Sequence, residues 1–422
     1  MASALEEKVL AWIDANRTGI IEFLQKLLSF PSVTGDELEI QQFIAHHLES
    51  LGLEIDMWEP DLEELKLHPA YVAVERGYEN RPNLVGKYTG TGGGRSLLFN
   101  GHVDVVPPGP PESWEHPPWA AEIAGDRIYG RGVSDMKGGV AAMTMAVEAV
   151  LAAGIKPKGD ILLEYVMDEE LSGNGTLACV MKGYRADAGI CCETSSLAVQ
   201  PACLGRIWFE IRIEGKPTGI QRQWEGVNAI EKGYKVVEAV SRLEAIRIAE
   251  VSHPLYPDNR GAMPCMVGIF QSGSFPSSFP DTCLLKGSIA SLPGEETAAV
   301  KRQFREFITA FAATDPWLKD HPPEVIFSGY CGDPAEIPVD HPIVTTVSKM
   351  FNRVTGEEAR ITGREGAADI RYLIKYGDTP TVIFGPGLTE QMHAANEWAR
   401  LDDLITAVKV LALTIIQWCG WE

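Results

Sequence analysis

The stretch FNGHVDVVPPG, residues 99–109, decides the fold and points to a site. An apolar run that ends at Phe99 is followed by His102 and Asp104, and the strand pattern breaks at Pro107 and Pro108. Residues two apart in a strand point to the same face, so His102 and Asp104 project together from the carboxyl end of the predicted strand. Two polar side chains in this position make a poor core and suit a metal site, for which the rest of the chain must supply further ligands.

The composition limits the class of protein. The chain has 422 residues and a net charge of −21, which argues against a nucleic-acid partner. Single cores stop growing at roughly 250–300 residues, so we expect two domains. No apolar run reaches the ~18 residues that cross a bilayer, which argues against a membrane protein. The first thirty residues have an amphipathic helix pattern rather than a signal peptide, so we expect a cytoplasmic protein. The eight cysteines form no CxxC pair and should be buried thiols.

The pattern of predicted helices and strands changes twice along the chain. Residues 1–204 alternate helix and strand patterns, which is typical of an α/β sheet covered on both faces. Residues 205–330 instead have the order strand, helix, strand, strand, helix, strand, which predicts a four-stranded antiparallel sheet of the ferredoxin-like kind. The alternating helix and strand pattern of the first region returns at residues 331–422. We therefore predict an α/β domain of residues 1–204 and 331–422, interrupted by an inserted α+β domain.

Carboxylates occur where the predicted strands end and where a helix begins. Asp135 lies in the glycine-rich stretch GDRIYGRGVSDMKGG just before a long helix, although a helix cap is the commoner role for such a residue. Asp168, Glu169 and Glu170 come directly after the apolar strand DILLEYVM. Three consecutive carboxylates repel one another unless cations neutralise them, and an exposed acidic turn is the alternative interpretation.

Two more candidate ligands obey the same rule. Glu193 ends the apolar run AGICCE, and His393 lies in MHAANEW after the strand TPTVIFGPG. In open α/β sheets, ligands bind beyond the carboxyl ends of the strands. Two imidazoles with three or four carboxylates suit one or two divalent cations such as zinc or manganese. Because thiolates are absent from these motifs, a catalytic site is favoured over a structural one.

Taken in order, these motifs resemble a known family. The stretches NGHVDVVP, YGRGVSDMKGG, DEE, CCET, GVNAIEK, DIRYL and HAANEW are similar to the co-catalytic metallo-aminoacylases. That family includes acetylornithine deacetylase, succinyl-diaminopimelate desuccinylase and the glutamate-releasing carboxypeptidases. The resemblance covers nearly the whole chain. It implies a zinc-peptidase-like catalytic domain with a mixed central sheet, and an inserted lid that forms a homodimer or higher homo-oligomer.

The resemblance also implies a ligand set for one or two divalent ions, zinc or manganese, with cobalt as a further option. Asp135 would bridge two ions. His102 and Glu193 would complete one of them, and Glu170 and His393 the other.

The same resemblance implies further roles. Asp104 would orient His102 through its second ring nitrogen, and Glu169 would be the general base. Arg371, in DIRYL, matches the arginine that binds a substrate carboxylate, for which a surface arginine is the alternative. Asn228 would present a polar group from the inserted domain or cap the helix that begins after it.

The family pattern breaks at Gly219, where a histidine of the inserted domain is expected. In the family this histidine helps to hold the oxyanion, and the loss of such a donor costs roughly 2.7–4 kcal/mol. Three explanations compete. Gln221 or Arg222 would supply the missing donor, or the protein would have lost its activity. In the third, the developing negative charge of the substrate would spread into the substrate's own ring. Trp208 and Trp224 would offer flat surface to such a ring, although core packing is the commoner role.

We therefore predict a metal-dependent hydrolase that cleaves a C–N bond of a small carboxylate-bearing substrate, an N-acyl amino acid or a related amide. One alternative is an aminohydrolase that releases ammonia from an electron-poor aromatic amino acid, similar to 5-nitroanthranilate aminohydrolase. Another is a non-catalytic binding protein on the same fold, which has no reason to keep a free base at Glu169.

Overall fold

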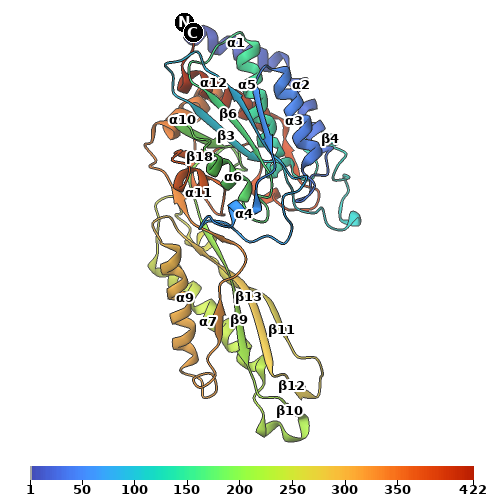
Figure 1. Cartoon of the computed structure of the whole chain (residues 1–422), viewed down its shortest axis with the longest axis vertical. Coiled ribbons are helices and arrows are strands. Elements are labelled where there is room, and N and C mark those ends of the chain that lie inside the picture. Colours follow the sequence, from blue (N-terminus) through green and yellow to red (C-terminus); the bar gives the residue numbers. More distant parts are fainter. Residues whose placement is uncertain (1) are drawn as a thin grey trace. The chain divides into compact units, whose positions relative to one another are not determined.

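The computed structural model describes residues 2–422, with side chains at all of these positions except 2, 3 and 259. The chain divides into two compact units (Figure 1). The main unit contains the chain up to Ala202 together with Glu336–Thr362 and Ala368–Glu422. The inserted unit contains Cys203–Ala335 and Gly363–Ala367.

The borders of the units differ slightly from the predicted ones. The inserted unit continues past residue 330 because a short strand, β15 (Cys331–Gly332), still pairs with its sheet. Residues 363–367 also belong to it, and the Tyr256 hydroxyl donates a hydrogen bond to the Arg364 carbonyl at 3.0 Å. Because these two segments are far apart in the sequence, no periodicity of the sequence predicts this contact.

The main unit is built from strands and helices in alternation. Its helices are α1 (Ala2–Ala15), α2 (Arg17–Leu28), α3 (Leu38–Ser50), α4 (Leu62–Leu65), α5 (Gly138–Ala152), α6 (Asn174–Lys182), α10 (Pro342–Thr355), α11 (Ile370–Lys375) and α12 (Leu401–Cys419). Strands in it or at its borders are β1 (Glu54–Trp58), β2 (Asn83–Tyr88), β3 (Leu97–His102), β4 (Ile123–Ala124), β5 (Arg127–Tyr129), β6 (Ile161–Val166), β7 (Ala188–Cys191), β8 (Val199–Cys203), β16 (Ala335–Glu336), β17 (Ile361–Arg364), β18 (Thr381–Ile383) and β19 (Trp398–Arg400).

The central sheet is mixed, as expected. Its strand order is β1-β2-β6-β3-β7-β18-β8-β16, and β17 pairs with β8. The neighbours β6, β3, β7 and β18 run parallel to one another, whereas β2 and β8 flank them antiparallel. The four parallel strands therefore end at the same edge of the sheet.

Both faces of this sheet are covered. Along β3, Leu97 and Phe99 join the core formed with α1, α2, α5 and α12, and Leu98 joins the opposite core with α6 and α11. All three side chains are fully buried, and each such burial stabilises the fold by about 1.5–3 kcal/mol. A continuous apolar run is what a strand covered on both faces requires.

The inserted unit has the predicted ferredoxin-like arrangement. Its main strands lie in the order β11-β13-β9-β14, all antiparallel, and β15 also pairs with β9. The helices α7 and α9 pack on one face of this sheet. Elements of this unit are β9 (Gly205–Glu214), β10 (Thr218–Gly219), α7 (Ala229–Glu250), α8 (Asn259–Ala262), β11 (Cys265–Ser272), β12 (Ser278–Phe279), β13 (Thr282–Ser291), α9 (Thr297–Ala312) and β14 (Glu324–Ile326).

Two tryptophans of the inserted unit do not pack in its core. Trp208 is 50% exposed because the alternation along β9 turns Ile207 and Phe209 inward and Trp208 outward. Trp224 is 75% exposed in the turn Ile220–Glu225. The expectation of core packing was therefore wrong for both. Within the described residues, none of the helices is both long and apolar enough to span a membrane.

Candidate metal centre

Five predicted ligands meet at the carboxyl edge of the main unit's sheet. The strands β3, β6 and β7 lead into His102, Glu170 and Glu193, and His393 lies in the loop after β18. Asp135 joins them from the turn that precedes α5. The parallel order of the four strands explains why residues from such distant parts of the chain come together.

The five side chains form two groups that share Asp135. On one side, His102 Nε2 lies 3.1 Å from Asp135 Oδ1 and 3.7 Å from Glu193 Oε1. On the other side, His393 Nε2 lies 3.3 Å from Asp135 Oδ2 and 3.0 Å from Glu170 Oε2. Each oxygen of Asp135 thus faces a different imidazole and a different carboxylate group.

These separations fit divalent cations. Tetrahedral zinc holds nitrogen and oxygen ligands at about 2.0–2.2 Å, which places the ligand atoms roughly 3.3–3.6 Å from one another. One ligand atom each of His102, Asp135 and Glu170 also lies within 4.8 Å of the others. The donor set therefore suits one or two cations, with Asp135 between them.

The clustered carboxylates and imidazoles of the site, together with their burial, shift the pKa values of these groups. Hydrogen bonds to Asp135 and Glu170 raise the pKa of His393 to about 10. Burial works to lower the pKa of His102, but the carboxylates around it raise it well above its usual value. Burial raises the pKa of Glu170, and the negative charge of Asp135 adds to the rise. So much buried negative charge favours a cation at this place.

Asp104 acts differently from the expectation. The backbone carbonyl of Asp104 accepts the hydrogen bond from His102 Nδ1 at 2.9 Å, whereas its Oδ1 is 3.6 Å from that nitrogen. The carboxylate instead accepts the backbone N–H of Glu169 at 3.1 Å and of Glu170 at 3.3 Å, and the hydroxyl of Thr34 at 2.8 Å. Asp104 thus fixes the ring by its main chain and the two glutamates by its side chain.

A buried arginine pairs with the first of the three consecutive carboxylates. Asp168 has a positive φ of 66° and turns inward, where Arg81 Nη2 donates to Asp168 Oδ1 at 2.8 Å. Arg81 also binds both oxygens of Glu37, and the hydroxyls of Tyr78 and Ser172 donate to Asp168. The exposed acidic turn is therefore excluded. Neither Arg81 nor Glu37 carries a sequence motif, and sequence reasoning missed both.

Glu169 lies beside the first group of predicted ligands. Its side chain is 15% exposed, and its Oε2 is 3.9 Å from His102 Nε2. Burial raises the pKa of Glu169 well above its usual value, and the neighbouring His102 partly opposes the rise. A raised pKa brings a carboxyl group toward the range in which it both takes and returns a proton near neutral pH.

Arg371 is not a surface arginine. It is buried near the start of α11, where its Nη2 donates to the carbonyl of Ser172 at 3.1 Å. Its Nη1 lies 3.7 Å from Asp369. A Cβ atom on Gly173 would lie 2.6 Å from Arg371 Nη2, so the guanidinium uses space that only glycine leaves open. The arginine thus holds the loop that comes after Glu170.

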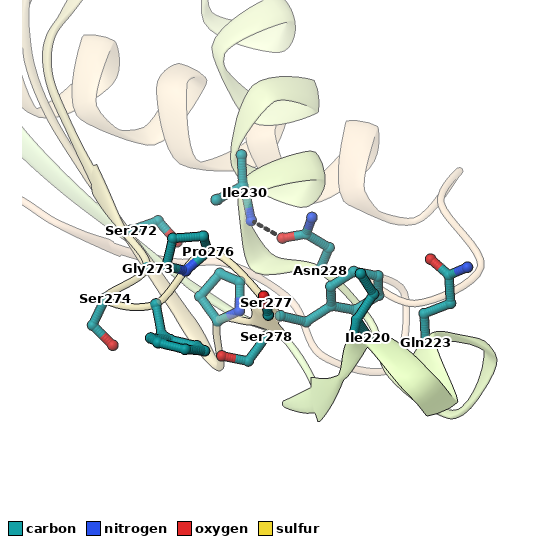
Figure 2. A pocket seen from close by; sticks show the side chains of 13 residues that line it. Ile220, Gln223, Asn228, Ile230, Ser272, Gly273, Ser274, Pro276, Ser277 and Ser278 are labelled. Carbon is teal, nitrogen blue, oxygen red and sulfur yellow. Dashed lines mark hydrogen bonds between the residues drawn. The ribbon is translucent and has the colours of Figure 1, made fainter.

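The remaining predicted site residues lie in the inserted unit and have local partners. Asn228 caps α7, and its Oδ1 accepts the N–H of Ile230 at 3.0 Å on the wall of a hollow of about 530 Å³ (Figure 2). Arg222 is exposed and donates to Glu225 at 2.6 Å. Gly219 is exposed as well, in the short ribbon of β10 with β12.

Comparison with known proteins identifies the family. The model of the peptidase family M20/M25/M40 matches residues 98–417. The chain belongs to this family. It is a metal-dependent hydrolase of amide or peptide C–N bonds, as predicted.

Relatives match nearly the whole length of this M20 protein. It is 30% identical to N-formyl-4-amino-5-aminomethyl-2-methylpyrimidine deformylase of Halalkalibacterium halodurans, over 98% of this chain and 97% of the relative. A tripeptidase from Staphylococcus aureus has a TM-score of 0.74 at 22% identity, over 95% of this chain and 98% of the other. A dinuclear metal-binding M20 peptidase from Bacillus subtilis has a TM-score of 0.66 at 16% identity, over 96% and 99%. These two structures show the shared fold.

Proposed function

We propose that the M20 protein hydrolyses the amide bond of a small N-acylated amine, with Glu169 as general base. One observation carries the proposal: two ligand groups share Asp135, and Glu169 stands beside them with its carboxylate 3.9 Å from His102. A carboxylate that is next to a cation site and not needed as a ligand is suited to proton transfer.

Five side chains hold the cations in this proposal. His102, Asp135 and Glu193, whose side chains lie together, would hold one ion, and Asp135, Glu170 and His393 would hold the other. Zinc or manganese fits these nitrogen and oxygen donors. Cations at this place lower the pKa of water and polarise a carbonyl group.

Proton transfer is assigned to Glu169. It takes a proton from the attacking water as the water oxygen adds to the carbonyl carbon. When the C–N bond breaks, the same carboxyl group gives this proton to the leaving nitrogen, so the products are an amine and a carboxylic acid, which then ionises by losing its own proton. Asp104 holds Glu169 in place through the backbone N–H, and Arg371 holds the end of the same loop.

The substrate class has two candidates. The family resemblance favours an N-acyl amino acid, with a carboxylate that Arg371 would bind. The deformylase of H. halodurans, similar over nearly the whole chain, favours an N-formyl amine on a pyrimidine ring. Both substrates are small amides that the same groups cleave. We also propose a homodimer or higher oligomer formed through the inserted unit.

A substrate screen tests the proposal. We expect the protein loaded with zinc or manganese to release amine from an N-acetyl amino acid or from the N-formyl aminomethylpyrimidine, and to lose this activity on chelation. Dipeptides and aminobenzoates complete the screen, with amine, formate and ammonia measured separately. Release of ammonia from an aminobenzoate alone would favour the aminohydrolase. A protein that binds cations and turns over none of these compounds would contradict the proposal.

The position of the missing lid histidine gives a further prediction. Gly219 has φ −81° and ψ 160°, and an added Cβ meets only the flexible Gln221 side chain, at 3.2 Å. A side chain is therefore tolerated there. We expect Gly219→His to raise kcat for N-acyl amino acids by roughly 10²-fold, the size of one oxyanion donor.

Gly219→Ala is the control for this change, because it adds a Cβ without a donor. Rates should be compared with both N-acetyl amino acids and the N-formyl pyrimidine. If the histidine and alanine variants have the same kcat on every amide, the missing donor does not limit this enzyme.

A further inference from the structure

Glu397 is a buried carboxylate to which neither the sequence nor the family comparison gave a role. It lies just before β19, is fully buried, and has four hydrogen-bond donors around it. Its Oε1 accepts the backbone N–H groups of Ser134 at 2.8 Å and Asp135 at 3.2 Å. Its Oε2 accepts the N–H of Gly132 at 2.8 Å and Nη1 of Arg131 at 2.7 Å.

These contacts hold the turn that carries Asp135. The turn leaves three buried N–H groups for Glu397, and buried N–H groups without an acceptor are costly. The turn also has little freedom to adjust. Gly132 has φ +84°, and a Cβ there would lie 2.5 Å from Val105. The carboxylate therefore fixes the backbone directly at the shared ligand.

Through Arg131, the same group is also linked to the backbone of His393, which carries the second imidazole. Glu397 is four residues from His393 in a segment whose chain turns sharply, and His393 itself has a positive φ of 60°. Arg131, which is paired with Glu397, also donates from Nη2 to the His393 carbonyl at 3.4 Å. The Glu397 carbonyl accepts the N–H of Gly130 at 3.0 Å. The two loops are thus tied together on both sides of the ligands.

We propose that Glu397 is a positioning residue that sets the separation of Asp135 and His393 and thereby the affinity for cations. The inference rests on the ligand set of the proposed function. A glutamine at this position has one acceptor oxygen, and its amide group would face N–H donors. Loss of such a partner behind metal ligands typically weakens metal binding by about 10- to 100-fold.

Cation titration of the full-length apoprotein with Zn²⁺ or Mn²⁺ tests this. Glu397→Gln should bind the cation about 10- to 100-fold more weakly than wild type, and saturating cation should restore most of kcat. Glu295→Gln is the matched control: it removes a carboxylate 2.8 Å from the buried Arg247 in the inserted unit. This control should keep wild-type cation affinity.

The outcomes separate the two proposals. If wild type binds neither cation, the ligand set itself is wrong. If wild type binds and folded Glu397→Gln binds equally well, only the positioning role is overturned, whatever the change in thermal stability. Should the glutamine variant not fold, Glu397→Asp decides: it keeps the charge but shortens the reach, and unchanged cation affinity overturns the inference.

Discussion

Replacing Glu169 by glutamine is expected to lower kcat by about 10²- to 10⁴-fold, the usual contribution of a general base, while the cation content stays at the wild-type level. The amide of glutamine has nearly the shape of the carboxylate but takes no proton near neutral pH. Its backbone N–H still reaches Asp104, so the loop keeps its position. Single-turnover rates and metal analysis of the purified variant measure the two effects separately.

The adjacent residue is the control for this variant. Glu170 lies 3.0 Å from His393 and is assigned as a ligand, so Glu170→Gln should lose cation as well as activity. The two neighbours thus separate proton transfer from cation binding. Wild-type turnover in Glu169→Gln would contradict the proposed mechanism. Equal loss of cation in both variants would make Glu169 a ligand.

Local sequence signals predict the place of the site. An apolar run that ends in His102 or Glu193 marks the end of a strand, and parallel strands end at one edge of a sheet. The order of elements in the inserted unit is predicted in the same way, because alternation along β9 is a property of neighbouring residues. Such signals predict where ligands gather without any knowledge of tertiary contacts.

The residues that hold the site in place have no such local signal in the sequence. Arg81 meets Asp168 from 87 residues away, and Glu397 meets Ser134 from 263 residues away. Asp104 shows a subtler failure. The period of two correctly places it beside His102, but the direction of its carboxylate depends on the N–H groups of Glu169 and Glu170. Which donor a buried carboxylate takes is decided by packing, which sequence patterns do not describe.

The buried arginine gives the second large effect, on stability. Arg81 is 2% exposed and binds Glu37 at 2.7 Å and Asp168 at 2.8 Å. We expect Arg81→Met to lower the free energy of unfolding by about 3–5 kcal/mol, because two buried carboxylates lose their cation. The loop that begins at Asp168 also carries Glu169, so kcat should fall in whatever fraction remains folded. Chemical denaturation and steady-state rates measure both effects.

An exposed ion pair of the same unit is the control. Arg17 and Asp402 are 2.6 Å apart with side chains 39% and 79% exposed, so Arg17→Met should cost less than about 1 kcal/mol. Arg81→Met combined with Glu37→Met should recover part of the loss, since one of the two unpaired charges is removed with it. Equal unfolding free energies for Arg81→Met and Arg17→Met would show that the buried charges find other partners. In that case Arg81 would not be the residue that turns Asp168 inward. It would also not be what keeps the charge of Asp168 away from Glu169 and Glu170.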